Sequence, residues 1–396
     1  MDAHPVRLVL RKNEDRRLFR GDPWVYAGEI LSPLGGIEPG AVAEVFTADG
    51  RFVGSGFVNP KSTIAVRILS RNRLEPVDAD LIRRRIETAD RLRRRVEPEN
   101  TCYRMVFGEA DRLPGLVIDR FAGTLVLQVT TAGIERWKET IVAILAELVP
   151  GAQIIEKSIA PAREKEGLAP VVRVVTGGET ACQEIEINGL VFAIDFLHSQ
   201  KTGFFLDQRL NYRLLAPLAG GQEVLDCFSY VGAWGLHAAA YGARHVEFLE
   251  ISPEFLAQTA RHIARNGLAP DRFTLTQADA IVRLREMSDA GVQKDLIVLD
   301  PPAFVKSRTK VLDAARGYRE INLRALKMVR PGGFLITCSC SHFLSRDDFL
   351  TVVGEAAADA GRQVKLLICQ GPPPDHGFAL NGGQSDYLKC ALLAVY

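Results

Sequence analysis

Acidic side chains follow three short apolar runs that we expect to be strands. Asp226 leads into a turn of small residues, 227–232, in which backbone can approach a ligand closely. Glu250 can accept hydrogen bonds from both hydroxyls of a ribose, although the helix dipole alone also favours a carboxylate at the start of a helix. Asp279, followed by Ala280, offers an acceptor for an adenine amino group. These residue types indicate a polar ligand with hydroxyl and amino groups.

A fourth strand end and a pair of cysteines could bring reactive groups to the same pocket. Asp300 precedes Pro301 and Pro302, which fix an extended turn without amide donors and leave Asp300 as an acceptor. Cys338 and Cys340 alternate along the next expected strand, so both thiols should face the same side. They are either nucleophiles at the rim of the pocket or two buried core cysteines. As metal ligands they lack partners, and we expect no metal site.

The glycine pattern argues against a dinucleotide ligand. Only Gly232 and Gly235 follow the first strand of this region, so the G-x-G-x-x-G signature of a Rossmann dinucleotide site is missing. An NAD-dependent dehydrogenase is therefore disfavoured.

A second candidate ligand surface lies in the first thirty residues. Arg17 stands in a basic cluster that is interleaved with Phe19, Trp24 and Tyr26. Such interleaving suits an RNA backbone and its unstacked bases, but it is equally typical of a solvated loop beside core aromatics. A helix predicted over 78–96 carries seven arginines and leaves the same choice between phosphate contacts and a solvated face.

The elements that would hold these residues fall into three groups. Short strands with glycine turns, up to about residue 70, predict a small closed β-barrel. A strand-strand-helix-strand pattern over the next hundred or so residues predicts a small α+β unit. From about residue 184, apolar strands alternate with helices, which indicates a parallel sheet covered on both faces. We therefore predict domains over 1–72, 73–183 and 184–396.

In the last domain the acidic residues should meet at one edge of the sheet, because ligands bind outside the carboxyl ends of parallel strands. The strands are expected at 224–226, 246–250, 274–277, 295–300 and 333–338, and the helices at 235–241, 253–266, 281–287 and 318–329.

The composition is that of an ordinary globular chain. The 396 residues include 49 Lys and Arg against 48 Asp and Glu, a net charge of +1, which excludes a disordered chain or a histone-like polycation. The seven cysteines form no C-x-x-C pair, and their odd number predicts reduced thiols. No apolar run reaches the roughly 18–20 residues of a membrane span, and the N-terminus lacks the apolar core of a secretory signal, so we expect a cytoplasmic protein.

Taken together, these residues resemble class I S-adenosylmethionine-dependent methyltransferases. Within that class they are similar to the ribosomal RNA large subunit methyltransferase I group, which forms 5-methylcytosine in 23S ribosomal RNA. The most specific match is Q-K-T-G-F-F-L-D-Q-R at 200–209. It is followed, in order, by matches to D-x-F-S-Y-x-G at 226–232, D-P-P-x-F at 300–304 and S-C-S at 339–341.

The resemblance implies an α/β fold. A C-terminal methyltransferase domain, Rossmann-like with a seven-stranded sheet, would follow a small β-barrel PUA-like domain and a small α+β linking domain. The PUA-like match rests on G-D-P-W-V at 21–25, where Asp22 replaces the family's histidine. The implied cofactor is S-adenosylmethionine, and the implied partner is 23S ribosomal RNA or an assembling large subunit. A homodimer is the default oligomeric expectation.

The resemblance also implies roles for individual residues. Cys340 would attack C6 of a cytosine, with Cys338 as the alternative nucleophile, and Asp300 would stabilise the base. Ala303 stands where other RNA cytosine-5 methyltransferases carry a second cysteine, which excludes a mechanism with a thiol there. The cofactor would be bound by Phe204, Phe205, Asp207, Gln208, Arg209, Asp226, Phe228, Tyr230, Gly232, Glu250, Asp279, Ala280, Asp300 and Pro301. The substrate would be bound by Pro302, Phe304, Lys201, Arg17 and Trp24.

Two rival functions stay open on this sequence. An enzyme of the same fold could methylate a guanine nitrogen of ribosomal RNA, a reaction that needs no cysteine. A non-catalytic RNA-binding or assembly factor could keep the fold after losing activity.

Overall fold

The computed structural model describes residues 4–178, 180–304, 311–380 and 386–396. The chain divides into two compact units, and each unit is built from more than one segment. The first unit comprises Met1–Ile185, Ile194–Leu206 and Pro374–Gln384, and the second comprises Glu186–Ala193, Asp207–Pro373 and Ser385–Tyr396. The division into three domains stays a prediction.

The first sheet is a five-stranded barrel-like sheet in the order β1-β3-β4-β5-β2. A bridge between Leu10 and Ile30 connects the end of β1 to the segment after β2, so the two edges of the sheet approach each other as in a barrel. A short helix, α1 (Arg16–Phe19), precedes β2. The strands are β1 (Val6–Val9), β2 (Trp24–Tyr26), β3 (Ala41–Phe46), β4 (Phe52–Val58) and β5 (Ile64–Ser70).

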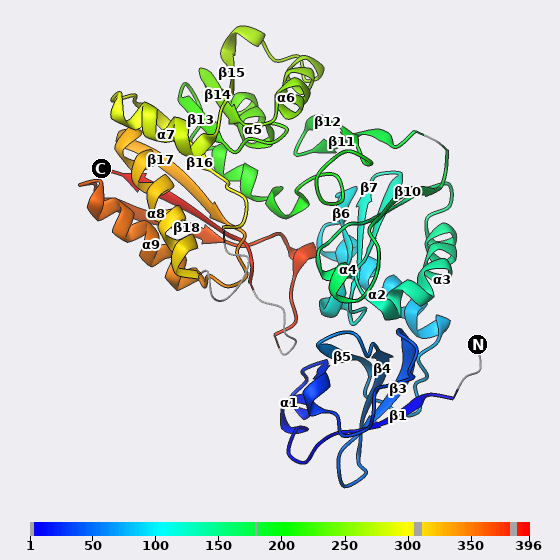
Figure 1. Ribbon diagram of the computed structural model, residues 1–396. Helices are drawn as coiled ribbons and strands as arrows, with labels where there is room; N and C mark the ends of the chain where they lie inside the picture. Colours follow the sequence, from blue (N-terminus) through cyan, green and yellow to red (C-terminus); the bar gives the residue numbers. More distant parts are fainter. Residues whose placement is uncertain (1–3, 179, 305–310, 381–385) are drawn as a thin grey trace. The chain divides into compact units, whose positions relative to one another are not determined.

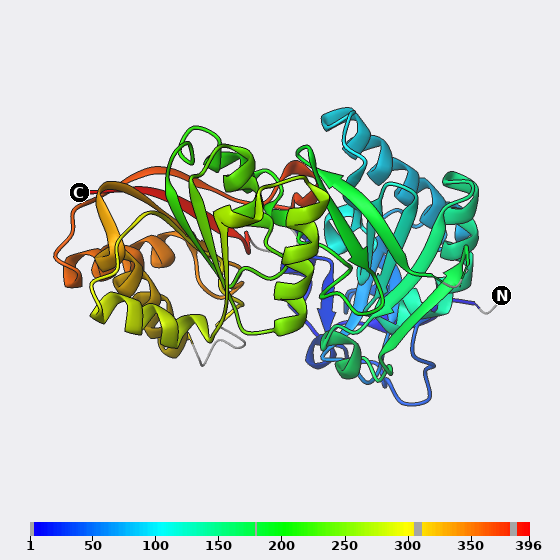
Figure 2. The same ribbon diagram turned by 90° about the horizontal axis from the view of Figure 1, so that it is seen from above.

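The second sheet of this unit has the order β10-β9-β8-β7-β6. Helices α2 (Ala79–Val96) and α3 (Ala132–Leu148) pack their apolar sides into one core with the sheet. Figure 2 shows both helices beside the strands of this sheet. Asp78 caps α2 by accepting a hydrogen bond from the Leu81 amide at 2.8 Å. The remaining elements are β6 (Cys102–Phe107), β7 (Leu116–Phe121), β8 (Thr124–Val129), β9 (Gln153–Ser158), α4 (Ala162–Lys165) and β10 (Val171–Thr176).

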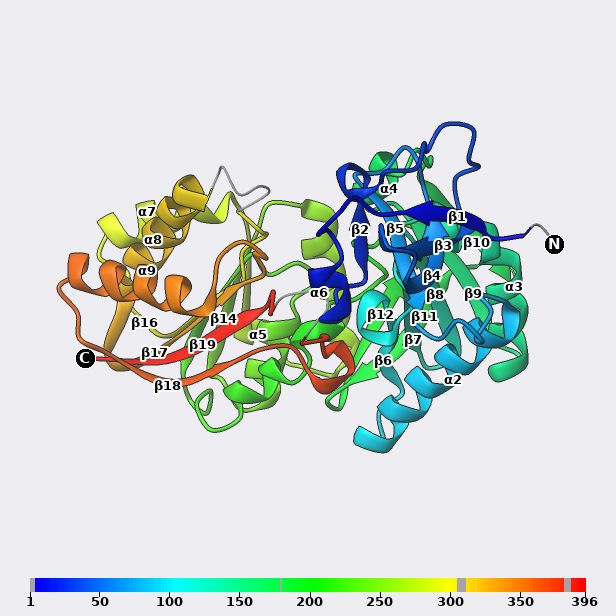
Figure 3. The same ribbon diagram turned by 90° about the horizontal axis from the view of Figure 1, so that it is seen from below.

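A two-stranded hairpin, β11 (Cys182–Ile187) and β12 (Leu190–Asp195), leads into the third sheet. That sheet has seven strands in the order β15-β14-β13-β16-β17-β19-β18, which confirms the seven-stranded prediction. Its first five strands are parallel, whereas β19 runs antiparallel to both β17 and β18 (Figure 3). The strands are β13 (Glu223–Cys227), β14 (His245–Glu250), β15 (Phe273–Gln277), β16 (Lys294–Leu299), β17 (Val329–Ser339), β18 (Val364–Gln370) and β19 (Lys389–Val395).

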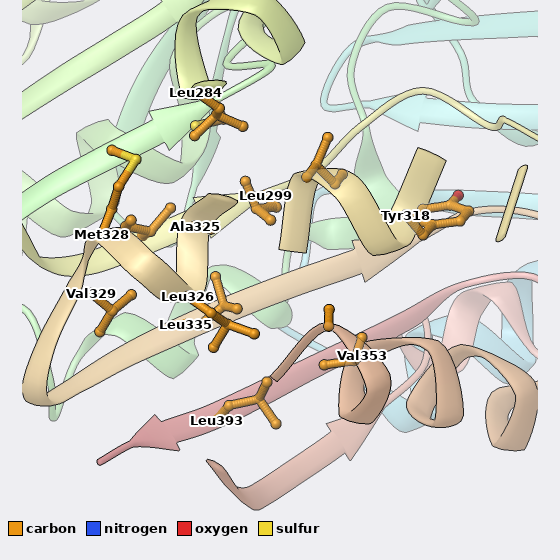
Figure 4. Packing of buried hydrophobic residues seen from close by; sticks show 14 of the residues in the cluster. Leu284, Leu299, Tyr318, Ala325, Leu326, Met328, Val329, Leu335, Val353 and Leu393 are labelled. Atoms are coloured by element: carbon orange, nitrogen blue, oxygen red, sulfur yellow. The ribbon is translucent and has the colours of Figure 1, made fainter. Parts of the chain in front are cut away.

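Helices cover both faces of this sheet. Helices α7 (Ala280–Asp289), α8 (Val311–Met328) and α9 (Arg346–Asp359) share one core, and α5 (Ala233–Ala240) and α6 (Pro253–Arg265) lie on the opposite face (Figure 1). Figure 4 shows the first of these cores, where Leu335 of β17 and Leu393 of β19 meet Leu326 of α8 and Val353 of α9. No helix in the described part of the chain is long and apolar enough to cross a membrane.

Register places the strand ends side by side. Cys227 of β13 pairs with Leu249 of β14 and with Leu299 of β16. The residues that come next, Glu250 and Asp300, therefore stand level at one edge of the sheet.

Two helix glycines differ in the space around them, and this difference predicts opposite effects on stability. A Cβ on Gly235 in α5 would overlap the Phe248 ring and lie 2.8 Å from Val246 Cγ1, whereas a Cβ on Gly354 in α9 would meet nothing within 4 Å. Gly235→Ala should destabilise by about 1–3 kcal/mol through overpacking. Gly354→Ala should stabilise by up to about 1 kcal/mol, because alanine favours a helix interior.

Thermal unfolding checks this pair, because 1 kcal/mol moves the midpoint by about 2–4 °C in a unit of this size. A midpoint for Gly235→Ala equal to or above that of Gly354→Ala would refute the packing argument.

Candidate active site

The loop after β13 has an unusual backbone. Phe228 and Tyr230 have φ angles of +60° and +50°, and Gly232 has +81°. Positive φ is uncommon for residues other than glycine, and such conformations gather at functional sites. At Gly232 a Cβ would also lie 2.6 Å from Thr259 Cγ2, so glycine is needed for close packing as well as for conformation. The loop is therefore a tight, specified turn at the carboxyl end of β13.

Glu250 holds this loop in place. Its Oε2 accepts a hydrogen bond from the Tyr230 amide at 2.8 Å, and its Oε1 accepts one from the Ser252 amide at 3.0 Å. Ser252 in turn caps α6 by accepting from the Phe255 amide. Each carboxylate oxygen has a second lone pair, so these bonds leave capacity for the two hydroxyls of a ribose.

Asp279 has a structural task that the sequence analysis did not assign to it. It is exposed and caps α7, where its Oδ1 accepts from the amides of Ile281 at 2.8 Å and Val282 at 3.2 Å. Ala280, the first residue of that helix, is buried. The cap explains the residue type at this position, and an adenine contact by Asp279 and Ala280 stays a prediction.

Asp300 is fixed by donors from two other segments. The Gln208 side-chain amide donates to both carboxylate oxygens at 3.0 Å, and the Trp234 indole N–H donates to Oδ2 at 2.9 Å. Gln208 is itself oriented, because Asn211 donates to its Oε1 at 2.6 Å and Gln370 donates to Asn211 at 2.6 Å. A chain of three amides thus ends at Asp300. Sequence analysis placed Gln208 at the cofactor and gave no role to the other three donors.

Three carboxylates form an acidic cluster at this edge of the sheet. Burial raises the pKa of Asp226 well above its usual value, and the nearby Asp300 and Glu250 raise it further, against one hydrogen bond from the Gly235 amide. Within the described residues, Asp226 Oδ1 and Ser229 Oγ are buried without a hydrogen-bond partner. Like charges in a desolvated site repel, so a positively charged ligand would stabilise the cluster.

Residues 207 and 209 are buried beside Gln208. Asp207 Oδ2 accepts a hydrogen bond from the Tyr387 hydroxyl at 2.8 Å, and the Arg209 carbonyl accepts one from the Asn188 side chain at 2.7 Å. These bonds connect the 207–209 segment to the hairpin and to the approach to β19, all within the second unit. Contacts of Asp207 and Arg209 with a cofactor stay predictions.

The two cysteines of the S-C-S region differ sharply. Strand β17 ends at Ser339, so only Cys338 lies within it, where it pairs with Cys390 of β19. Cys338 is fully buried, and burial raises the pKa of its thiol well above the usual value. Cys340 is half-buried just beyond the strand, with Sγ 3.9 Å from the Pro301 carbonyl oxygen. Both thiols would face the same side only if the strand continued through Cys340. Strand β17 ends at Ser339, between the two cysteines.

A buried tyrosine supports the turn that carries Cys340. The Tyr318 hydroxyl, on α8, lies 3.0 Å from the hydroxyls of both Ser339 and Ser341. The Phe304 ring packs on Tyr318 with centroids 4.8 Å apart. Pro301 is buried and Pro302 is exposed. Tyr318 carried no signal in the sequence, because nothing near it in the chain marks it as a partner of the S-C-S motif.

Five predicted site residues belong to the first unit, Arg17, Trp24, Lys201, Phe204 and Phe205. Phe204 is buried, and the Lys201 ammonium lies 4.2 Å from the centroid of the Phe205 ring. Arg17 is partly exposed and is held by an ion pair with Asp22 at 2.5 Å, by one with Glu29 at 2.7 Å and by a hydrogen bond to the Trp24 carbonyl at 2.8 Å. Their contacts with RNA or cofactor stay predictions.

Most arginines of α2 bind groups of this chain. Arg83, Arg84 and Arg94 form ion pairs with Glu147, Glu75 and Asp90. Arg93 is buried and forms an ion pair with Asp111 at 2.6 Å, and Arg85 donates to two carbonyls. Much of the helix charge is therefore neutralised internally, which favours the solvated-face interpretation over a strip of phosphate contacts.

All seven cysteines lie in the described residues, and each is a free thiol. Reduced thiols stay a prediction, with which this arrangement agrees.

Comparisons with known proteins agree with this architecture. A family model described as a PUA-like domain matches residues 8–71, and one described as an S-adenosylmethionine-dependent methyltransferase matches residues 170–375. A solved structure of a SAM-dependent methyltransferase from Streptococcus mutans is 19% identical, with a TM-score of 0.83 over 98% of this chain and 100% of that one. Another methyltransferase, solved in complex with SAH, is 18% identical with the same TM-score and coverage. Fold and site thus define an S-adenosylmethionine-dependent methyltransferase with a PUA-like domain.

Sequence relatives narrow the class. Ribosomal RNA large subunit methyltransferase I of Shewanella denitrificans is 39% identical over 396 residues, 99% of this chain and 100% of the relative. The protein of the same name from Alteromonas mediterranea is 34% identical over 97% of each chain. The chain belongs to the ribosomal RNA large subunit methyltransferase I family.

S-adenosylmethionine is the cofactor, and the residues of the second unit fit it. Its sulfonium and ammonium groups would be favoured by the acidic cluster of Asp226, Glu250 and Asp300. The unpartnered Asp226 Oδ1 and Ser229 Oγ can accept from its amino group, and Glu250 keeps lone pairs for ribose hydroxyls. We infer that these residues hold the cofactor.

Replacing Glu250 tests the ribose contact. In Glu250→Gln one oxygen becomes an NH₂ group, which cannot accept a hydrogen bond and would face an amide donor. We expect S-adenosylhomocysteine to bind about tenfold more weakly in isothermal titration calorimetry, a loss of about 1.4 kcal/mol. Glu254→Gln, an exposed substitution with the same charge change in the first turn of α6, is the matched control. Equal affinities of the two variants would contradict the assignment.

Replacing Gln208 tests the amide chain. Gln208→Glu keeps the side-chain shape but sets a carboxylate against Asp300 where an amide donated to it at 3.0 Å. We expect methyl transfer to slow by at least about tenfold, because like charges at this distance repel and displace Asp300. Gln222→Glu, which adds the same charge at the exposed other end of β13, should keep the wild-type rate. A full rate in Gln208→Glu would show that the bond to Asp300 is dispensable.

Proposed function

We propose that this protein transfers a methyl group to C5 of a cytosine in ribosomal RNA of the large subunit, with Cys340 as the nucleophile. The names of the relatives support the RNA substrate. The observation that carries the chemistry is the position of Cys340. Its Sγ lies 3.9 Å from the carbonyl oxygen of Pro301, the residue that follows Asp300, so thiol and carboxylate come from adjoining turns.

The proposed reaction needs a thiol because cytosine C5 is a weak nucleophile. The Cys340 thiolate forms a bond to C6, and the C5–C6 π electrons become available at C5. S-adenosylmethionine, when bound, would supply an electrophilic methyl group, and the electron pair of the broken S–CH₃ bond would stay on the sulfur of S-adenosylhomocysteine, the leaving group. C5 is then bonded to that methyl, a base takes the C5 proton, and the electrons of the C5–H bond re-form the double bond as the C6–S bond breaks. The thiolate is thereby returned for the next cycle.

Asp300 is proposed to hold the pyrimidine through N3 and N4. The donors Gln208 and Trp234 occupy one side of its carboxylate and fix its plane. The exocyclic amino group of cytosine is a donor that a carboxylate oxygen can accept. At N3, which is an acceptor in neutral cytosine, the contact requires the protonated form of Asp300.

Cys338 is the poorer candidate for the nucleophile. A thiol must ionise to attack, and burial raises the pKa of Cys338 while Cys390 packs against it. Cys340 is the thiol with access to the turns of Asp300 and Pro301. Ala303 leaves no second cysteine in the proline turn.

The target base must leave its stack to reach this site. We propose that the PUA-like barrel and the residues Arg17, Trp24 and Lys201 contribute RNA contacts. Pro302 and Phe304 would line the path of the base. The substrate would be 23S ribosomal RNA, free or in an assembling subunit.

Nucleoside mass spectrometry of 23S ribosomal RNA tests the proposal. Cells that lack the protein should lose one 5-methylcytidine, wild type should restore it, and Cys340→Ala should leave it absent because no bond to C6 can form. Cys338→Ala is the matched control, since it removes a buried thiol two residues away and should still restore the modification.

Other outcomes would redirect the assignment. Restoration by Cys340→Ala but not by Cys338→Ala would transfer the nucleophile to the other thiol. Loss of a methylguanosine with unchanged 5-methylcytidine would replace the cytosine mechanism by methylation of a guanine nitrogen. No change in any methylated nucleoside would favour a non-catalytic assembly role.

A further inference from the structure

A buried lysine stands beside the cysteine turn. Lys389 is the first residue of β19, and its side chain is completely buried. Its ammonium donates to the carbonyls of Ser341 at 2.8 Å and Tyr387 at 3.1 Å. Among the described residues, no carboxylate lies within ion-pair distance of it. Burying a charge without a counter-charge is costly, so its presence calls for a physical reason.

The position of Lys389 connects it to Cys340. Lys389 pairs with Ser339 across β17 and β19, and its ammonium binds the carbonyl of Ser341. Cys340 lies between these two serines. The Tyr318 hydroxyl bonds the hydroxyls of both serines. The turn is therefore clamped by a phenol on α8 and by an ammonium on β19.

We propose that Lys389 is a positioning residue for the Cys340 nucleophile, holding its turn and providing the positive charge that stabilises the thiolate. The inference rests on the proposed function of Cys340, and it adds the group that would make that thiol reactive. An adjacent cation favours a thiolate over a thiol.

Among the described residues, the other ionisable groups around Lys389 leave it without an ion-pair partner, although Asp386 lies near it. Arg346 of α9 forms an ion pair with Asp386 at 2.8 Å, so these two charges compensate each other. Burial raises the pKa of Cys369 on β18 and of Tyr318 on α8, and both therefore stay neutral near neutral pH. Burial lowers the pKa of Lys389, while nearby Asp386 and Cys340 act in the opposite direction. Cys340 is thus the partner whose ionisation the lysine can favour.

Alkylation of Cys340 measures this pairing without RNA. The full chain is treated with iodoacetamide over a range of pH, and the Cys340 peptide is quantified by mass spectrometry. In wild type the midpoint of the rate profile should lie below the ordinary thiol value of about 8.5. Lys389→Met should raise the midpoint by about one pH unit and slow alkylation near neutrality by about tenfold.

Two variants separate charge from shape. Lys389→Arg keeps the positive charge and should return the midpoint toward that of wild type. Tyr318→Phe loosens the other side of the clamp without changing charge, so its midpoint should stay at the wild-type value. A merely structural lysine would not produce this pattern.

Several outcomes would overturn the inference. One is a pH–rate profile of Cys340 alkylation in Lys389→Met that coincides with the wild-type profile. If the variant does not fold, as judged by circular dichroism, a wild-type midpoint at or above about 8.5 would do so on its own. The result is also distinct from the nucleoside experiment. If Cys340→Ala still made 5-methylcytidine while Lys389→Met shifted the midpoint, the proposed function would fall and the lysine–thiolate pair would stand.

Discussion

Negative charge concentrated at one edge of a parallel sheet is the constraint on which the second unit depends. Register brings Glu250 and Asp300 level at the ends of β14 and β16, and Asp226 lies buried on β13, the strand between these two. In this desolvated setting each carboxylate needs donors or a cation. Backbone amides donate hydrogen bonds to Glu250 and Asp226, and the Gln208 amide and the Trp234 indole donate to Asp300. A cationic cofactor completes the compensation.

These donors come from segments that are far apart in sequence, so the site also organises the fold around it. The amide chain to Asp300 runs from Gln370 at the end of β18 through Asn211 to Gln208. Strand β19 runs antiparallel to both β17 and β18. Strand β18 therefore runs in the same direction as the parallel strands and ends at the same edge of the sheet. Because the bonds at the two ends of this chain join positions 159 and 92 residues apart, local sequence patterns carry no trace of them.

The sequence predicted the parallel part of the sheet well, because apolar strands and helical periodicity are local signals. It did not place β18, β19 or α9. The edge strand β18 shows no regular alternation of buried and exposed residues, and β19 is buried throughout. Of the site, the strand-end residues were predicted from type and position alone. The cap at Asp279 and the internal ion pairs of the arginine-rich helix were not, since a capping aspartate or a paired arginine looks the same in sequence as a ligand-binding one.

The two cysteines illustrate how a single strand boundary decides chemistry. Spacing of two residues predicts equivalent thiols only while the strand continues. Pairing with β19 fixes Cys338 opposite Cys390 in the core, where desolvation keeps it protonated. One residue beyond the last pair, the backbone is held by Tyr318 and Lys389 instead of by a neighbouring strand. Polar side chains can hold a turn while its thiol stays accessible. If the pairing of β17 with β19 continued through Cys340, it would bury that thiol. The end of β17 at Ser339 therefore separates a cysteine buried in the core from the one that we propose as the nucleophile.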